Sequence, residues 1–273
     1  MNLTTYRGHY EACRKEYIGP SDTTLYSSVY DLSMDDKMLE LSEEYDDVVA
    51  TASRKITQKL DYETGCFRQT HALRLNDWRD VEEIGEIAEI VMPQLEEKLF
   101  HSNLAVEFVH PYRNMQPSSS EVQSSWKWHY DDCPKEFLKL FIHLNDVTEK
   151  NGCMQLLCEP DNRFNVIESS RIGPNNRGAP QRDQKYLGSR VPREVIAESL
   201  ASGARIHNIT GDIGKYFILT PNIVHRATVP EKNTVPRDIL AFFIRPTLRK
   251  RKYISDRTHS YLPERNVKRY PLD

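Results

Sequence analysis

The apolar positions of the first hundred residues predict two helices with a strand between them. From 35 to 60 and from 81 to 100, apolar side chains return every three or four positions, so each segment has one apolar face. Pro93 is expected to kink the second helix, because proline removes a backbone hydrogen bond. Between the helices, residues 65–75 alternate between apolar and polar side chains, which is the period of a strand.

Short apolar runs dominate after residue 104 and predict a part made mainly of strands. Residues 137–144 and 153–158 are rich in apolar side chains, and the turn residues between them predict that the second run returns beside the first. Residues 192–202 are an exception, with a proline near the start and a glycine just past the end, which predicts a short helix. Helices followed by a run of strands predict a mainly β fold with some α: a cupin-like double-stranded β-helix (jelly roll), buttressed by the N-terminal helices.

We expect a single domain over residues 1–273, a length that is ample for a buried core. Its helical N-terminal part covers about 30–100. The jelly-roll core covers about 104–250 and contains an insertion at 160–203.

Composition narrows the class of protein. The net charge of −3 argues against a generally basic nucleic-acid binder. There is no apolar run of eighteen residues to predict a membrane span, and the first residues lack the apolar region of a signal peptide. The five cysteines are odd in number and contain no Cys-x-x-Cys pair, which argues against a disulfide scaffold or a zinc ribbon. The sequence therefore predicts a cytoplasmic protein, and it leaves the oligomeric state open.

Two histidines and one aspartate carry the strongest chemical signal. His129 and Asp131 are separated by one residue, and His225 ends the segment Pro-Asn-Ile-Val-His far downstream. Two imidazoles and one carboxylate on one face of a metal leave the opposite positions open, which is the geometry of non-haem Fe(II) oxygenases. Arg237 follows at the start of an apolar run and provides the fixed positive fork that the distal carboxylate of a 2-oxo acid needs.

Several other residues compete for these roles. A His-x-Asp/Glu triplet alone is weak evidence, since roughly one is expected by chance in such a chain, and we interpret His9-Tyr10-Glu11 as that match. His143 and His207 lie in strand patterns without a suitably spaced carboxylate and are interpreted as structural. Arg245 lies at the other end of the strand from Arg237, roughly 25 Å away at the rise of a strand, so both cannot serve one pocket.

The motifs around these residues resemble the phytanoyl-CoA dioxygenase family. Trp-x-Trp-His-x-Asp over 126–131 is similar to the stretch found in its ectoine hydroxylases, and an apolar strand ending in Leu-Asn-Asp-Val-Thr-Glu-Lys-Asn-Gly follows it. Downstream, Gly-Asp-Ile-Gly-Lys-Tyr-Phe over 211–217, Pro-Asn-Ile-Val-His over 221–225 and Arg237 resemble the second half of the family pattern. The resemblance covers about 104–158 and 204–246, or about a third of the chain.

The resemblance implies a non-haem dioxygenase that uses Fe(II), 2-oxoglutarate and O2. It implies that His129, Asp131 and His225 are the iron ligands and that Arg237 holds the far carboxylate of 2-oxoglutarate. A small hydroxyl residue often sits two positions after the distal histidine. Here that position is Ala227, which leaves Thr228 as the substitute. Tyr112 is carried over as a further co-substrate contact. The retained Asp131 argues against the halogenases of this family, which need the carboxylate position empty.

The substrate is expected to be a small molecule, and its identity stays open. Residues 171–193 carry six basic side chains, one acidic side chain and several glycines and prolines. A cationic lid over the iron would favour an anionic substrate, but a solvated basic loop fits the pattern equally well. The alternatives to a dioxygenase are a cupin-type metal-dependent lyase or isomerase, against which Arg237 counts, and a non-catalytic jelly-roll binding module, against which the intact triad counts.

Overall fold

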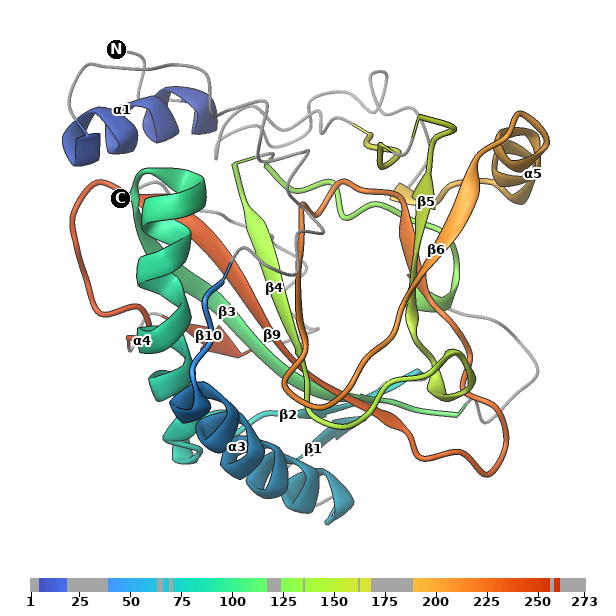
Figure 1. Ribbon diagram of the computed structural model, residues 1–273, viewed down its shortest axis with the longest axis horizontal. Helices are drawn as coiled ribbons and strands as arrows, with labels where there is room; N and C mark the ends of the chain where they lie inside the picture. Colours follow the sequence, from blue (N-terminus) through green and yellow to red (C-terminus); the bar gives the residue numbers. More distant parts are fainter. Residues whose placement is uncertain are drawn as a thin grey trace.

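The computed structural model describes residues 5–18, 39–62, 66–68, 71–116, 124–134, 136–161, 163–167, 189–255 and 258–260. Within them the fold is mixed α/β, with two sheets that are antiparallel except for one short strand (Figure 1). The large sheet has the order β1-β2-β3-β9-β4-β7, with β10 beside β3, and the small sheet has the order β6-β5-β8. The strands of the large sheet are β1 Cys66–Arg68, β2 Ala72–Leu75, β3 Asn103–Asn114, β4 Leu138–His143, β7 Tyr216–Leu219, β9 Arg237–Thr247 and β10 His259–Ser260. Those of the small sheet are β5 Met154–Cys158, β6 Arg205–Ile209 and β8 His225–Ala227.

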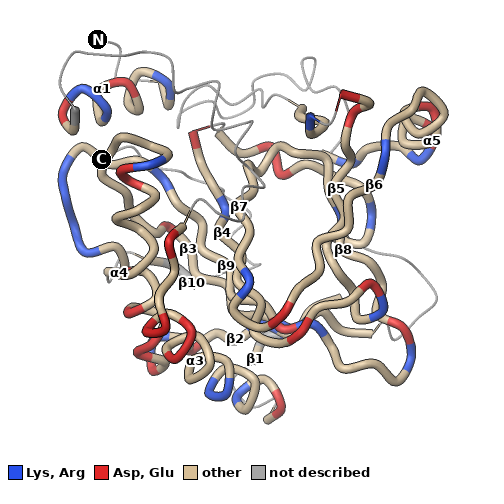
Figure 2. Tube along the Cα trace, in the orientation of Figure 1, with Lys and Arg blue, Asp and Glu red and all other residues tan. Residues whose placement is uncertain are grey.

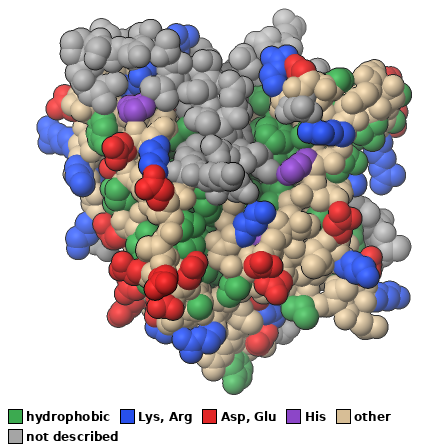
Figure 3. All heavy atoms as spheres, in the orientation of Figure 1, with side chains coloured by type: hydrophobic (Ala, Val, Ile, Leu, Met, Phe, Trp, Pro, Cys, Tyr) green, Lys and Arg blue, Asp and Glu red, His purple; other side chains and the backbone are tan. Residues whose placement is uncertain are grey.

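Helices α3 Glu43–Asp61 and α4 Glu83–Leu95 cover the outer face of the large sheet, and α4 runs on into a π-helical turn, Glu96–Phe100. Helix α1 Tyr6–Ile18 contacts β3 and β9, whereas α5 Arg193–Ala201 lies by the small sheet, where its Ile196 clusters with Leu157 of β5 (Figure 1). The apolar stripes of α3 and α4 pack on outward side chains of β3, β4 and β9 in one core cluster. Figures 1 and 2 show both helices along one side of the sheet, with acidic residues at the start of α3. Figure 3 shows acidic side chains gathered on the surface of this region. None of the described helices has the length and hydropathy needed to cross a membrane.

The inner faces of the two sheets form a second core cluster. Phe141 and Phe217 from the large sheet stack with their ring centroids 4.8 Å apart, and Leu156 from the small sheet belongs to the same cluster. Strand alternation turns Ile239 of β9 toward this interior, while Leu240 joins the helix-covered core. By the same alternation, side chains two residues apart on β3 and β9 share the interior face.

The chain passes repeatedly from one sheet to the other. β3 and β4 lie in the large sheet, β5 and β6 in the small one, β7 in the large, β8 in the small and β9 in the large. Between β3 and β4, His129 pairs with the first residue of β8, so this segment also joins the small sheet. This order is consistent with the predicted jelly roll.

The helix predicted over 192–202 is confirmed as α5, whereas several other boundaries predicted from the sequence were wrong. The first predicted helix begins at Glu43, since residues 39–42 are not helical. The strand predicted over 65–75 is a hairpin of β1 and β2, because alternation continues through both strands and does not mark the turn between them. Pro93 does not interrupt its helix, and the π-helical turn follows it at Glu96.

β5 does not return beside β4, as the turn residues between them had suggested. Both edges of β4 are occupied, by β7 and by β9, so β5 pairs with β6 and β8 in the other sheet. The connection contains a 3-10 turn, Glu149–Asn151, whose capping box starts at Thr148. Of the basic segment 171–193, residues 171–188 lie outside the described residues, and only Arg190 and Arg193 of its cations can be placed.

Candidate metal and co-substrate site

The structure brings the three predicted metal ligands together. One ligand atom from each of His129, Asp131 and His225 lies within 4.8 Å of the others. The two imidazole centroids are 4.3 Å apart, and Nε2 of His225 lies 3.6 Å from Oδ2 of Asp131. Two imidazoles and a carboxylate at this separation can hold one metal ion. Their assignment as the iron ligands stays a prediction.

Backbone hydrogen bonds join the two distant segments that carry these side chains. The amide of His129 donates to the carbonyl of His225 at 2.9 Å, and the amide of His225 donates back at 2.8 Å. The amide of Asp131 donates to the carbonyl of Pro221 at 2.8 Å. Directly paired residues present their side chains on the same face of a sheet, so both imidazoles share one face.

Asn222 makes a second connection, which the sequence patterns did not indicate. Its side-chain oxygen accepts from the amide of Cys133 at 3.1 Å, and its Nδ2 donates to the carbonyl of Cys133 at 2.9 Å. Asn222 is 1% exposed. It therefore fixes the segment that follows Asp131 against the segment that precedes His225. The only signal for it in the sequence is its place in the Pro-Asn-Ile-Val-His motif.

We expect Asn222→Ala to weaken metal binding by about 10- to 100-fold, the usual cost of losing a residue that supports ligands without touching the metal. Both polar groups of the buried Cys133 backbone would lose their partner, which costs about 1–3 kcal/mol for each. Mn(II) titration and urea unfolding would measure the two effects. The control is Asn208→Ala on β6, where the side chain bonds only Gln155 at 2.8 Å. Equal metal affinity in both variants would contradict a supporting role for Asn222.

Both histidines are held with Nε2 available to a metal. Nδ1 of His129 lies 2.8 Å from the carbonyl of Lys127, and Nδ1 of His225 lies 2.7 Å from the carbonyl of Ile223. A carbonyl only accepts, so each Nδ1 carries the proton and donates it, and each Nε2 keeps its lone pair. Burial lowers the pKa of both imidazoles, that of His129 well below its usual value. Both rings are therefore neutral near pH 7, as metal ligands must be.

Lys139 is a second residue that the sequence patterns did not indicate. It lies on β4, is buried, and its ammonium donates to Oδ2 of Asp131 at 2.5 Å. A charged residue within the apolar run 137–144 was the available signal, because a buried lysine needs an anionic partner. The ion pair orients the carboxylate and supplies a positive charge beside it.

Arg237 is buried in the interior with two of its nitrogens unsatisfied. It is 1% exposed, and neither Nε nor Nη1 has a hydrogen-bond partner in the part of the chain that the structure describes. Its Cζ lies 6.0 Å from the ring centroid of Tyr112, which places the predicted co-substrate contact beside it. Nε2 of His143 is also buried without a partner. Burial, followed by the charge of Arg237, lowers the pKa of His143 to about 4. The two unpaired guanidinium nitrogens of Arg237 are donors and mark a place suited to an anion.

Neither Thr228 nor Arg245 offers a free side chain to a co-substrate as clearly as Arg237 does. The hydroxyl of Thr228 donates to the carbonyl of Cys153 at 3.2 Å, so it is already bonded to the neighbouring strand. Its role toward a co-substrate stays a prediction. Arg245 is engaged elsewhere, because its Nε donates to Glu107 at 2.9 Å. Of the two arginines of β9, Arg245 is therefore engaged in an ion pair, and the co-substrate role of Arg237 stays a prediction.

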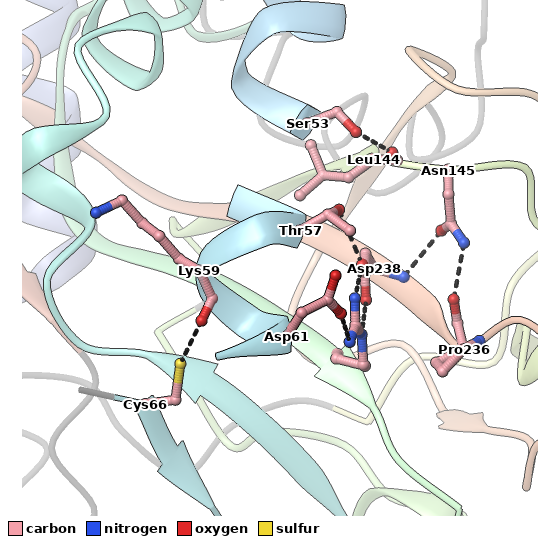
Figure 4. A network of polar contacts seen from close by, with 10 residues as sticks. Ser53, Thr57, Lys59, Asp61, Cys66, Leu144, Asn145, Pro236 and Asp238 are labelled. Carbon is pink, nitrogen blue, oxygen red and sulfur yellow. Dashed lines mark hydrogen bonds and ion pairs between the residues drawn. The ribbon is translucent and has the colours of Figure 1, made fainter. Parts of the chain in front are cut away.

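The start of β9 is held by a polar network on the opposite face of the sheet (Figure 4). Asp238 points away from the interior and accepts two hydrogen bonds from Arg113, at 2.7 and 2.8 Å. It also accepts from the hydroxyl of Thr57 on α3 at 3.0 Å. Its amide donates to the side chain of Asn145 at 2.9 Å. Because Asp238 adjoins Arg237, this network fixes the backbone from which the guanidinium extends.

The residues present fit the two predicted cofactors, iron and 2-oxoglutarate. The triad supplies three ligand atoms with neutral imidazoles, as a metal requires. The unpaired guanidinium of Arg237 supplies the donors that a carboxylate requires. The triad and the guanidinium of Arg237 both face the space between the two sheets.

Comparison with solved structures shows the same fold. EctD from S. alaskensis in its apoform is 12% identical, with 88% of each chain covered and a TM-score of 0.50. SnoK, a non-heme alpha ketoglutarate dependent carbocyclase from nogalamycin biosynthesis, is 13% identical, with 82% of this chain and 85% of that chain covered and a TM-score of 0.50. No protein-family profile matches the sequence, and neither does any curated protein. The likeness is therefore one of fold, and the resemblance to the phytanoyl-CoA dioxygenase family stays a prediction.

Proposed function

We propose that this protein is a non-haem Fe(II)- and 2-oxoglutarate-dependent dioxygenase of the phytanoyl-CoA dioxygenase type, built on a double-stranded β-helix. The observation that carries the proposal is the buried, unpaired guanidinium of Arg237 in the same interior as the triad. A metal-dependent lyase or isomerase needs the triad but has no use for this cation. A binding module needs neither.

Each residue has a distinct part in this proposal. His129, Asp131 and His225 hold the iron, Lys139 orients Asp131, and Arg237 binds the distal carboxylate of 2-oxoglutarate. Iron with 2-oxoglutarate and O2 supplies an oxidant for a substrate C–H bond, and a hydroxylation yields the alcohol, succinate and carbon dioxide. The apolar interior, with the Phe141–Phe217 stack, limits the access of water to the site.

The test is succinate formation from 2-oxoglutarate by anaerobically purified protein loaded with Fe(II). We expect slow succinate production without substrate, faster production with a substrate, and no production when O2 or Fe(II) is withheld. The protein with Arg237→Met is the matched control, since its triad is intact. Succinate formation that is equal in this variant, or absent from wild type across a broad substrate panel, would contradict the proposal.

A further inference from the structure

A second arginine faces the predicted iron site from the small sheet. Arg190 pairs with His129, and His129 pairs with His225, so the three residues lie side by side across neighbouring strands. The amide of Tyr130 donates to the carbonyl of Ser189 at 3.1 Å, and the amide of Val191 donates to the carbonyl of Trp128 at 2.9 Å. In such a pair the two central residues exchange no hydrogen bond with each other, and their side chains approach most closely.

The guanidinium of Arg190 therefore shares the face of His129. His225 in turn pairs with Leu156, which belongs to the interior cluster, so this face is the inner one. Electrostatics agrees with this placement. The charge of Arg190 is among the causes, after burial, that lower the pKa values of His129 and His225. The guanidinium thus lies close to both proposed imidazole ligands.

Among the described residues, no side chain is hydrogen-bonded or ion-paired with Arg190, although the charge of Asp131 acts on it. Its Nη1 is buried without a hydrogen bond, and no ion pair joins it to any residue that the structure describes. His71 adds a second unsatisfied group nearby. It is 5% exposed, and its Nδ1 has no hydrogen-bond partner among the described residues. Burial, and then the charges of Arg74 and Arg190, lower its pKa to about 4, so it stays a neutral hydrogen-bonding group.

The charges of the site are also unbalanced without a further anion. Fe(II) and dianionic 2-oxoglutarate cancel each other. Among the charged residues assigned to the site, the cations Lys139, Arg190 and Arg237 then face one carboxylate, Asp131. Arg237 extends from the large sheet beside Tyr112, whereas Arg190 adjoins His129 in the small sheet, so the two arginines approach the interior from different sheets. An arginine held in a partly buried place with free donors is suited to an oxyanion.

We propose that Arg190 is a substrate-anchoring residue that binds an oxyanion, a carboxylate or a phosphate, carried by the molecule to be oxidised. This inference rests on the proposed function, and it names the class of substrate for the same site. The anchor adjoins His129, so the anion would lie next to the iron, and the C–H bond to be oxidised would be few bonds away from it. Arg190 lies near the end of the basic segment 171–193. Of the two cations of that segment that the structure describes, Arg190 is the one whose side chain faces the predicted iron ligands.

The test uses simple anions as probes of the Mn(II)-loaded protein with saturating 2-oxoglutarate. Acetate represents a carboxylate and sulfate represents a phosphate, each titrated at constant ionic strength by tryptophan fluorescence and calorimetry. We expect saturable binding of at least one probe. Arg190→Gln should weaken it by about tenfold or more, whereas Arg190→Lys should retain part of it. Arg193→Gln is the control, because it removes the same charge from an exposed position three residues away.

The outcomes separate this proposal from the proposed function. Equal anion binding by wild type and Arg190→Gln would overturn the assignment, and so would the absence of saturable binding in wild type. Displacement of 2-oxoglutarate by the probe would place the anion at Arg237 and would also overturn it. Selective loss in Arg190→Gln, with 2-oxoglutarate affinity unchanged, supports it. If wild type binds the probe at Arg190 but never forms succinate, the proposed function fails and the anion site stands.

Discussion

His225→Ala is expected to abolish iron-dependent turnover and to weaken metal binding by more than about 100-fold. Loss of a residue that only supports the ligands already weakens metal binding by about 10- to 100-fold, and loss of a ligand itself should weaken it more. Among the described residues, one group of three side chains can hold the ion, and the variant removes one of its members from a rigid site. Mn(II) titration by calorimetry and Fe(II)-dependent succinate formation measure the two effects. Circular dichroism should show an intact fold, because the backbone hydrogen bonds with His129 do not need the imidazole.

The matched control is His207→Ala. His207 lies on β6 of the same sheet, is exposed and is paired with Leu156, as His225 is on the other side of β5. We expect unchanged metal affinity and turnover from it. Asp131→Ala is a less clean test than the histidine variant, because it leaves the ammonium of Lys139 buried without its anion. That would cost about 3–5 kcal/mol of folding stability as well as the metal. Full turnover by His225→Ala would end the triad assignment.

Arg237→Met is expected to act in opposite directions on function and on stability. Binding of 2-oxoglutarate should fall by about 100-fold or more, because each lost hydrogen bond to a charged group is worth about 1.5–3 kcal/mol. The cofactor-free protein should become more stable by about 1–3 kcal/mol, because a buried cation with two unsatisfied nitrogens is replaced by an apolar side chain of similar length. Mn(II) affinity should stay unchanged.

This opposition distinguishes a binding role from a structural one. Were Arg237 a structural residue, its replacement would lower the stability of the free protein, and 2-oxoglutarate affinity would change little. Urea unfolding without cofactors and 2-oxoglutarate titration of the Mn(II) protein make the comparison. Arg226→Met is the control. Arg226 follows His225 but bonds Gln155 at 2.8 Å and stacks on Trp128, so its loss should destabilise the protein without affecting 2-oxoglutarate.

The sequence predicted which residues would come together where a motif surrounds them. The His-x-Asp triplet alone was weak evidence, and the surrounding motifs with their family resemblance selected His129, Asp131 and His225, whose ligand atoms the structure places within 4.8 Å of one another. Arg237 could be preferred over Arg245 only by its distance from the histidine. The ion pair of Arg245 with Glu107 supplies the physical reason that was missing.

Residues that act through single nonlocal contacts could not be found in this way. Asn222 and Lys139 follow no periodicity, and each becomes meaningful only once its partner on another segment is known. Arg190 was marked in the sequence only as one of six cations in residues 171–193. The prediction of strand pairing was wrong for a related reason. Sequence proximity favoured β4 beside β5, but the neighbours of β4 are supplied by β7 and β9, which come much later in the chain. Local patterns describe each strand and do not say which strand lies next to it.

The reciprocal bonds between His129 and His225 also determine when a metal can bind during the folding of the chain. β4, β5, β6 and β7 all lie between the two histidines in the sequence, so the ligand set exists only after these strands have found their places. A metal therefore cannot guide early folding of this chain. It stabilises the folded protein by mass action, adding about 2.7 kcal/mol when its free concentration is about a hundred times its dissociation constant. In the proposed enzyme, iron loading is thus expected to be a late step of maturation, and the ion would join two segments that lie far apart in the sequence.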